Sequence, residues 1–558
     1  MYYLCAAIYI YTMKTGTKIG LGILGALIAL IAAAIIGADI WVSKLVNRQV
    51  DAALAKIEGG VAASCGTIHV RFLSGTAEVN DLYFTTDSTL ADGQPGFTAS
   101  IKRIEVGRVL YSELLRSHRL RFFNINIVEP HLSLTFDDKN PKSCLPALHD
   151  TTLATAGQWL ESIYIHHLNI ENASALIRST RTHLRVEADS LSVGLEDLLY
   201  SFADSLFTYD DTQYELSLGS LKTTLPDGLM ALETHDVKTR DEGPLKIGRT
   251  RFYHTIQPKQ LAKRMKEPVT WIDIELNSLT TSAFNPIHKA QNKDWTLDSL
   301  SVDVNKMRVA RNECYPPKRP YKMPQEVLLK IKEHFHIRSI NALVHKIDVS
   351  FASTDINNGK LALRNIRAQI KDAGNKSGTI WHNTISGPMG KEGKISASMA
   401  LHMDASSTFD CSITGSNLET DYLNSFIRPL VGMTCDCRIT QLDVNYTGNN
   451  QQITGDFCMQ YKGLKIQVHE EDDIPYKVVT KNAKTINNLA NTLIPKSNPT
   501  SVDNGPRRYN VVWKRDVWKP FEFYMFAPCI DGVKKTMLPG LYVHEQVRPQ
   551  KAKKTDAD

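Results

Sequence analysis

The sequence predicts a mainly β protein. We expect an N-terminal single transmembrane helix, followed by an extended, curved antiparallel β-sheet groove with a few short helices. Two observations predict this fold: an uncharged apolar run at residues 19–38, and alternation of apolar and polar residues along most of the chain. The overall composition, with 42% hydrophobic and 22% charged residues and a mean hydropathy of −0.23, excludes a polytopic membrane protein and wholesale disorder.

The apolar run, IGLGILGALIALIAAAIIGA at residues 19–38, is long enough to span a membrane, because twenty helical residues rise about 30 Å. A cleaved signal peptide is the alternative, but its apolar core usually has only about 7–15 residues. We therefore expect an uncleaved anchor with a cytoplasmic stub at residues 1–18. Met13 is the expected start within that stub, so residues 1–12 are expected not to be translated. Residues 39–60 form an amphipathic connector.

Runs of alternating residues predict strands with one apolar and one polar face. Sustained over hundreds of residues, such alternation indicates an antiparallel sheet with one side in water. A change of phase beside Gly463 predicts a β-bulge. The clearest runs begin at Ile68, Phe123, Leu132, Ile395, Phe409, Leu442, Phe457 and Leu464.

Helical patterns are few and short, which argues against an α/β crossover fold. A cluster of Pro, Lys and Arg at residues 316–320 is the best candidate for a boundary between two regions. We expect an N-terminal β-groove region at 61–315, a C-terminal β-groove region at 321–540 and a polar tail at 541–558. The helical patterns lie at 109–116, 324–333, 418–430 and 483–493.

Sequence motifs for catalysis or metal binding are missing. The pairs His166-His167 and His334-x-His336 have no carboxylate or Cys partner at a spacing typical of metal ligands. Residues 387–394 miss the spacing of a phosphate-binding loop, so we interpret them as a hairpin turn. There is no G-x-S-x-G nucleophile signature. We therefore expect a non-enzymatic protein with no catalytic, metal-binding or cofactor-binding residues and no cofactor.

The cysteines leave two interpretations open. Cys435 and Cys437 fall on one face of a predicted strand, and Cys458 lies on the next. A disulfide across this hairpin is one interpretation, and small buried apolar residues are the other. The net charge of +6 comes from 65 basic and 59 acidic residues spread along the chain, so we expect no nucleic-acid partner.

Loose motifs at both ends and in the middle suggest a family. A strand–turn–strand at Ile68–Thr86 follows the connector, and Ile104–Leu134 contains an I-x-I-x-x-P-x-[IL]-x-L strand. In this strand, and in Gly455–His469, Asn487–Pro499 and Lys514–Leu538, the chain resembles the AsmA-like family of Gram-negative envelope proteins, especially its Bacteroidetes-type members. The residues that match the strand motif are Ile125, Ile127, Pro130, Leu132 and Leu134.

The resemblance implies a single-pass protein of the inner (cytoplasmic) membrane whose large C-terminal part lies in the periplasm. Such a protein would handle or transfer phospholipid or another envelope lipid between the inner and outer membranes and support outer-membrane biogenesis. The alternative is a non-catalytic envelope scaffold or assembly modulator that binds protein partners. The residues expected to face lipid are Ile395, Ala397, Met399, Leu401, Met403, Leu442, Val444, Phe457 and Met459.

Overall fold

The computed structural model confirms a mainly β chain with few helices. It describes residues 61–539 except 72–73, 87–94, 111–112, 114–115, 140–160, 202–205, 209–212, 285–293, 354–355, 432, 469–487 and 489. The predicted transmembrane helix, connector and tail lie outside the described residues. The same holds for half of the predicted helix at 109–116 and for residues 483–487 and 489 of the one at 483–493, whose last residues, 490–493, are helical. Within the described part, none of the helices combines the length and the apolar character needed to cross a membrane.

The chain divides into two compact units between Thr255 and Ile256. The boundary therefore differs from the one expected at residues 316–320. Those residues lie inside the second unit, where they connect two neighbouring strands. Their Pro and charged residues signalled a connection of irregular structure, which the sequence pattern alone does not distinguish from a boundary between regions.

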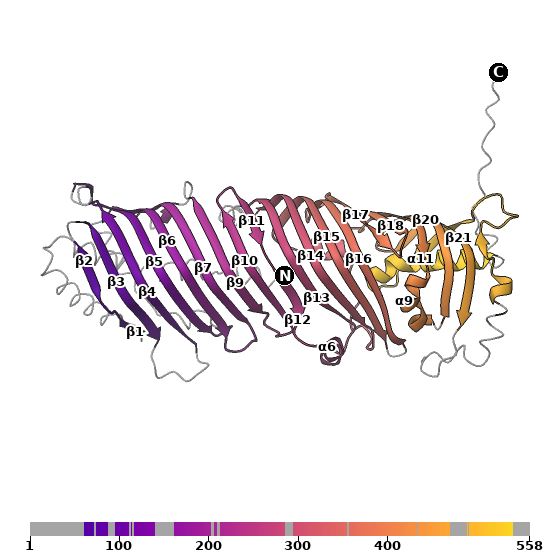
Figure 1. The fold of residues 1–558 in the computed structure, drawn as a ribbon, viewed down its shortest axis with the longest axis horizontal. Coiled ribbons are helices and arrows are strands. Elements are labelled where there is room, and N and C mark those ends of the chain that lie inside the picture. The colour runs from indigo at the N-terminus through magenta and orange to yellow at the C-terminus, as the bar shows by residue number, and fades with distance from the viewer. Residues whose placement is uncertain are drawn as a thin grey trace, which may run out of the picture. The chain divides into compact units, whose positions relative to one another are not determined.

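The first unit is a sheet in which most neighbouring strands are antiparallel (Figure 1). β5 and β6 are the exception, because they run parallel. The strands are β1 (Val61–Ser64), β2 (Ile68–Arg71), β3 (Thr76–Thr86), β4 (Gly96–Val109), β5 (Arg119–Phe136), β6 (Ser162–Ser179), β7 (Arg185–Ser201), β8 (Leu206–Thr208), β9 (Tyr214–Thr224), β10 (Met230–Arg240), β11 (Pro244–Ile247) and β12 (Thr250–His254).

Strand register aligns apolar residues of the first unit into rows across the sheet. On β2–β5 the residues of one such row are buried or nearly so, whereas Val193 on β7 and Leu216 on β9 are half-buried. The predicted one-sided sheet is thus present, with an apolar face that becomes more accessible toward β9. The row consists of Ile68, Val79, Ile104, Ile127, Ile170, Val193 and Leu216.

A line of irregularities crosses the first unit. On β3, β5, β6, β7 and β10 one residue has φ between 49° and 56°, a conformation that non-glycine residues rarely adopt. At each of them the phase of alternation changes, as between Ile170 and Ala173 on β6. Such bulges bend and twist a sheet. The residues are Asp81, Glu129, Asn172, Ser190 and Asp236.

The second unit continues the same construction with a meander of antiparallel strands after one parallel pair, β14 and β15. Its strands are β13 (Val269–Ala283), β14 (Asp294–Asn312), β15 (His334–Ser353), β16 (Ile356–Gly374), β17 (Ile380–Met389), β18 (Gly393–His402), β19 (Phe409–Glu419), β20 (Met433–Gly448), β21 (Gln452–Val468), β22 (Ser497–Asn498) and β23 (Arg508–Lys514). Its helices are α6 (Pro258–Met265), α8 (Pro324–Leu328), α9 (Asp421–Val431) and α11 (Phe521–Met537).

The expectation of a wholly antiparallel sheet is therefore wrong at two places, β5–β6 and β14–β15. A parallel pair needs a connection long enough to return along the strand, and residues 313–333 provide one in the second unit. Other local predictions are confirmed. Residues 387–394 form the end of a hairpin, in which 390–392 make the turn between β17 and β18 and Gly390 has φ +80°. Gly463, with φ +70°, lies at a register shift between β20 and β21.

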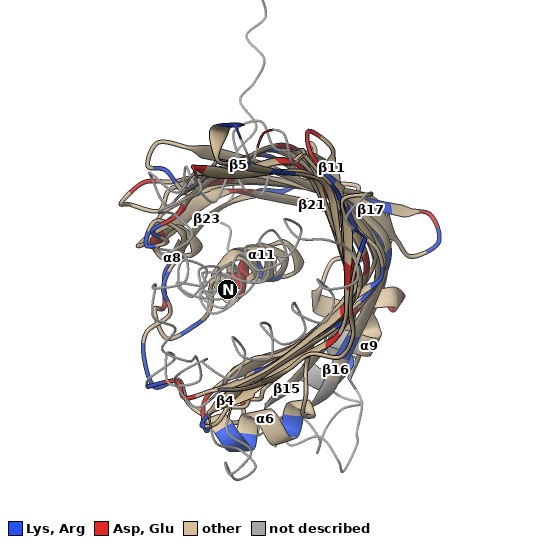
Figure 2. Ribbon diagram, turned by 90° about the vertical axis from the view of Figure 1, so that its left-hand side faces the viewer, with Lys and Arg blue, Asp and Glu red and all other residues tan. Residues whose placement is uncertain are grey.

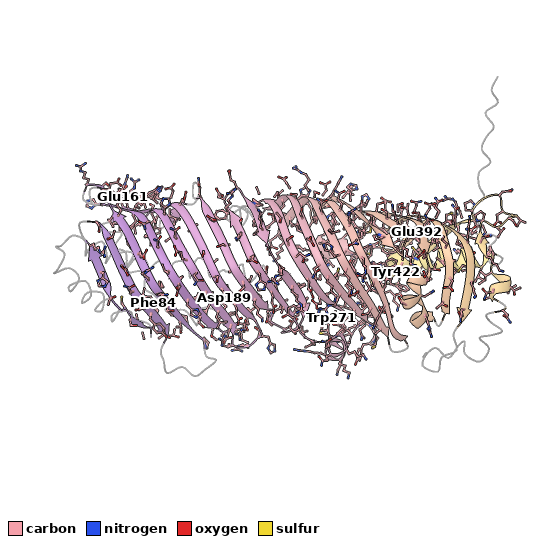
Figure 3. All side chains as sticks on the ribbon, in the orientation of Figure 1. Phe84, Glu161, Asp189, Trp271, Glu392 and Tyr422 are labelled. Atoms are coloured by element: carbon pink, nitrogen blue, oxygen red, sulfur yellow. The ribbon has the colours of Figure 1, made fainter. Side chains whose placement is uncertain are left out.

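The helices of the second unit lie on different sides of its curved sheet. Figure 2 shows α11 on the inner side and α6 on the outer side. α9 contacts β16 and β20, where the hydroxyl of Tyr422, labelled in Figure 3, donates to the carbonyl of Ala362. α8 and α9 confirm the helices predicted near 324–333 and 418–430, whereas α6 and α11 were not predicted.

Candidate functional site

One row of residues crosses the inner face of the second unit, with one residue from each successive strand. We call it the apolar row. Because directly paired residues point to the same face of a sheet, the register alone places its members together. The apolar row consists of Leu279, Val302, Ala342, Ala368, Ile385, Ala397, Ile413, Val444, Phe457 and Tyr509.

Exposure changes along the apolar row. Ile385 on β17 is 49% exposed, and its neighbours Ala368 and Ala397 are half-buried. Farther along, Val444 and Phe457 are each 1% exposed. The row is therefore open at β17 and closed at β20 and β21. An exposed large aliphatic side chain in line with a buried core marks a place where the sheet leaves apolar surface uncovered.

The covering element at the closed end is α11, which packs on β21 and β23. Gly532 of α11 lies so close to Phe457 that a Cβ atom there would be closer than 3.0 Å to three ring atoms. Phe409 meets the rings of Phe521 and Tyr524 edge-on, with ring centres 5.7 and 6.2 Å apart. At the closed end of the apolar row, α11 therefore covers the inner face of the sheet, and its aromatic side chains pack against those of the strands.

Two titratable groups in the core beneath α11 are held neutral. Burial raises the pKa of the Cys411 thiol to about 11, and burial also raises the pKa of Tyr446, whose hydroxyl donates to the Cys529 sulfur at 3.4 Å. Both groups are therefore neutral at physiological pH. The closed end of the apolar row is a packed protein core with no charged group at these positions.

The opposite face of the same strands is polar. Gln369 donates to the side-chain oxygen of Asn341 at 3.2 Å, and both belong to a row of hydroxyl, amide and carboxylate groups. Two hollows of about 660 and 540 Å³ are lined mainly by residues of this face. The polar row consists of Thr280, Ser301, Asn341, Gln369, Thr384, Ser398, Ser412, Asn445 and Asp456.

The nine residues expected to face lipid lie on strands whose register brings them to the inner face, with Met403 just beyond the end of β18. The structure distinguishes two groups among them. Half-buried are Ile395, Ala397, Met399 and Leu442. Buried in the core that includes Tyr524 of α11 are Leu401, Met403, Val444, Phe457 and Met459.

Comparison of the chain with protein-family models, curated proteins and solved structures found no match. The inner face is therefore interpreted from its own geometry.

Sequence reasoning missed Ile385, the one member of the apolar row that is exposed rather than half-buried or buried. The signal was present but weak: Trp381, Asn383 and Ile385 alternate with His382 and Thr384 on β17. Asn383 interrupts the apolar pattern, and Gly387-Pro388 end it two residues after Ile385. The structure shows that Asn383 is tolerated on this face because its amide donates to the carbonyls of Trp381 and Met399.

The histidine pair His166-His167 lies in the first unit beside acidic residues that were not apparent from the sequence. His166 Nδ1 lies 2.6 Å from Asp197 Oδ1, and the Tyr164 hydroxyl also donates to that carboxylate. Hydrogen bonds from Tyr164 and His166 lower the pKa of Asp197. Throughout the described part of the chain, however, no three His, Cys, Asp or Glu side chains are grouped so as to hold a metal ion.

The disulfide considered for Cys458 is wrong. In the strand register Cys458 lies opposite Asp443, whereas Cys435 lies opposite Ile466. Cys435, Cys437 and Cys458 are all free. Cys435 and Cys437 pack against the inner core near Thr420, so they serve as small apolar residues.

Proposed function

We propose that this chain binds the acyl chains of envelope lipids along the open part of the apolar row. It would do so as an AsmA-like protein of the inner membrane that handles or transfers lipid toward the outer membrane, without catalysis. The observation that carries the proposal is Ile385, 49% exposed in a continuous row of apolar residues on the inner face.

Dimensions support an acyl chain as the ligand. From β13 to β19 every member of the apolar row is half-buried or exposed, and we call this stretch its open part. It crosses seven strands, which corresponds to about 29 Å at ~4.8 Å per strand. The hydrocarbon core of a bilayer is about 30 Å thick and contains two layers of chains, so one chain needs roughly half that length. The open part of the row is therefore long enough for the chain of one lipid.

Energetics favour the same ligand. Covering apolar surface contributes about 0.8 kcal/mol for each buried CH₂ group, and an acyl chain offers many identical groups in line. The row supplies aliphatic side chains and alanines, which leave room for a chain beside Ile385. Hydrogen-bonding groups are gathered on the other face, which a hydrocarbon would not use.

The proposal is tested by placing a photo-crosslinking amino acid at Ile385 in the full chain in cells. The matched control is Thr384, the next residue, which is exposed on the polar face of the same strand. We expect phospholipid cross-links at 385 and none at 384, and we expect Ile385→Asp to reduce the lipid bound by a neighbouring probe at Ala368. Cross-links at 385 to protein alone would favour the scaffold function, and equal lipid labelling at both positions would contradict the proposal.

A further inference from the structure

A basic surface occupies one edge of the second unit. It is formed by residues 257–267, which include α6, and by the connection 313–333, which includes α8. These segments hold nine Lys or Arg and four Glu, and all nine cations are exposed. Figure 2 shows Lys and Arg over much of α6. The cations are Lys259, Lys263, Arg264, Lys266, Lys318, Arg319, Lys322, Lys330 and Lys332.

Six of the nine cations of this basic surface have no carboxylate close by within the described residues. Glu326 lies 3.8 Å from Arg515, and Glu313 lies 3.3 Å from Arg311, so two of the four carboxylates are engaged by cations outside the surface. Among the described residues, no carboxylate lies within 4.0 Å of Lys259, Lys263, Lys266, Lys318, Arg319 or Lys332. The neighbouring Lys330, in hydrogen-bond contact, lowers the pKa of Lys322, which is further evidence of crowded positive charge.

Exposed apolar and aromatic side chains accompany the cations. Val327 of α8 is 53% exposed. The turn at 515–520, which leads into α11, adds Val517 at 40% and Trp518 at 48%, and Phe523 follows at 41%. Lys519 Nζ lies 5.5 Å from the centre of the Phe523 ring. Exposed aromatic side chains among Lys and Arg are typical of segments that lie at a membrane–water interface.

Hydrogen bonds hold these parts together. Lys318 Nζ donates to the carbonyl of Met265 at the end of α6, at 2.7 Å. The backbone N–H of Tyr321 donates to the carbonyl of Val517 at 2.8 Å, and Nη2 of Arg515 donates to the carbonyl of Tyr321 at 2.6 Å. α6, the connection 313–333 and the turn before α11 therefore form one surface.

The connection is also rigid. Four prolines restrict its backbone, at positions 316, 317, 320 and 324. Met323 and Gln325 are fully buried, and the Gln325 amide donates to the carbonyl of Thr408 at 3.2 Å. The cations are thus presented from a fixed support, which lowers the entropy lost when they bind a partner.

We propose that this basic surface docks on a lipid bilayer that carries anionic headgroups. Lys and Arg near such a bilayer are attracted by its negative surface potential, and Val327, Trp518 and Phe523 enter the headgroup region. A bilayer is favoured over an acidic protein because the exposed apolar groups are spread among the cations, where a membrane interface accepts them without a matching pocket. This docking is independent of the acyl-chain binding proposed above.

The test uses the full chain in phosphatidylcholine nanodiscs, so that the apolar segment predicted at 19–38 is already accommodated. Flotation measures recruitment of these nanodiscs to vesicles of phosphatidylcholine alone or with 30% phosphatidylglycerol, an amount chosen on the order of natural anionic lipid content. We expect recruitment by the anionic vesicles only, with loss at high salt because exposed charges are screened.

The informative variant is Arg319→Glu/Lys322→Glu. Its matched control is Lys391→Glu/Lys394→Glu, which replaces two exposed cations at the β17–β18 hairpin and changes the net charge by the same amount. We expect about a tenfold or greater loss of recruitment for the first and wild-type recruitment for the second, because each cation near the bilayer strengthens binding severalfold. A third variant, Trp518→Ser, should weaken recruitment without changing its salt dependence.

Equal recruitment of both charge-reversal variants would overturn the proposal, as would salt-independent recruitment of the wild type. Binding to poly-glutamate with no recruitment to either vesicle would also overturn it, in favour of an acidic protein partner. Ile385→Asp distinguishes the two proposals, because it should leave recruitment unchanged whether or not the apolar row binds lipid.

Discussion

The contact between Gly532 and Phe457 predicts an unusual response to the substitution Gly532→Ala. A new Cβ would overlap three ring atoms of Phe457, whose side chain is only 1% exposed and has little room to move. α11 must therefore shift away from β21, or Phe457 must leave its position. The closed end of the apolar row depends on this contact.

Two opposing effects determine the magnitude. Alanine is about 1 kcal/mol more favourable than glycine in a helix interior. Overpacking a buried site costs about 1–3 kcal/mol. In the wild-type background Gly532→Ala should therefore destabilise the packing of α11 by up to about 2 kcal/mol. In a Phe457→Ala background the overlap is removed, so the same change should stabilise α11 by about 1 kcal/mol. The reversal of sign is the prediction.

Hydrogen exchange of the α11 amides is the suitable assay, because it reports the local opening of one element and does not require two-state unfolding of a large chain. We expect α11 to exchange up to about thirtyfold faster in Gly532→Ala, since about 1.4 kcal/mol corresponds to a factor of ten. Gly194→Ala is the control, because a Cβ there meets its nearest atom at 3.5 Å. Slower exchange of α11 in Gly532→Ala than in the wild type would refute the reasoning.

Three further predictions concern stability. Phe122 is fully buried, whereas its neighbour Phe123 is 47% exposed. Phe122→Ala should therefore reduce the protection of β5 against hydrogen exchange by about 3–5 kcal/mol, and Phe123→Ala should reduce it much less. Similar losses in the two variants would contradict the faces assigned to these side chains. The Asn375 side chain forms hydrogen bonds with the backbone of residues 331, 333 and 335. Asn375→Leu should therefore reduce the protection of β15 against hydrogen exchange by about 2–4 kcal/mol. Unchanged protection of β15 would count against these hydrogen bonds. Burial opposes ionisation of Asp503, but hydrogen bonds from Thr500 and the charge of Arg507 outweigh it and lower its pKa. The stability that ionised Asp503 contributes to the fold is therefore complete above its ordinary pKa of 3.8 and is lost as the pH falls through its lowered pKa. Asp503→Asn should lower the thermal stability at pH 7 and make the loss of stability below pH 3.8 less steep. An unchanged dependence of thermal stability on acid pH would exclude this role.

Much of the strand content could be predicted from the sequence, because period-two alternation is a local property. Residues 395–403 and 457–461 fall on strands, or at their ends, with their expected face inward. The turn at 387–394 was predictable for the same reason, since Gly and Pro act on the backbone where they stand. α9 was predictable from its spacing of apolar residues.

α11 could not be predicted in this way. It contains Pro528 and Gly532, which ordinarily weaken a helix, and its apolar residues are not confined to one side. Gly532 makes sense only beside Phe457, which lies far away in the sequence. The same distance explains the partial success at the candidate site: the shared face followed from alternation, whereas the covering of Val444 and Phe457 depends on a helix from another part of the chain.

The parallel pair β14–β15 has a consequence for how the second unit folds. Hairpins such as β15–β16 and β17–β18 can form from nearby residues, but β14 and β15 can pair only after residues 313–333 have closed a long loop. Until that loop has closed, β14 and β15 each have an unpaired edge. Because one covalent segment joins these edges, each meets its own partner at a high local concentration, which favours correct closure over pairing with another molecule during synthesis.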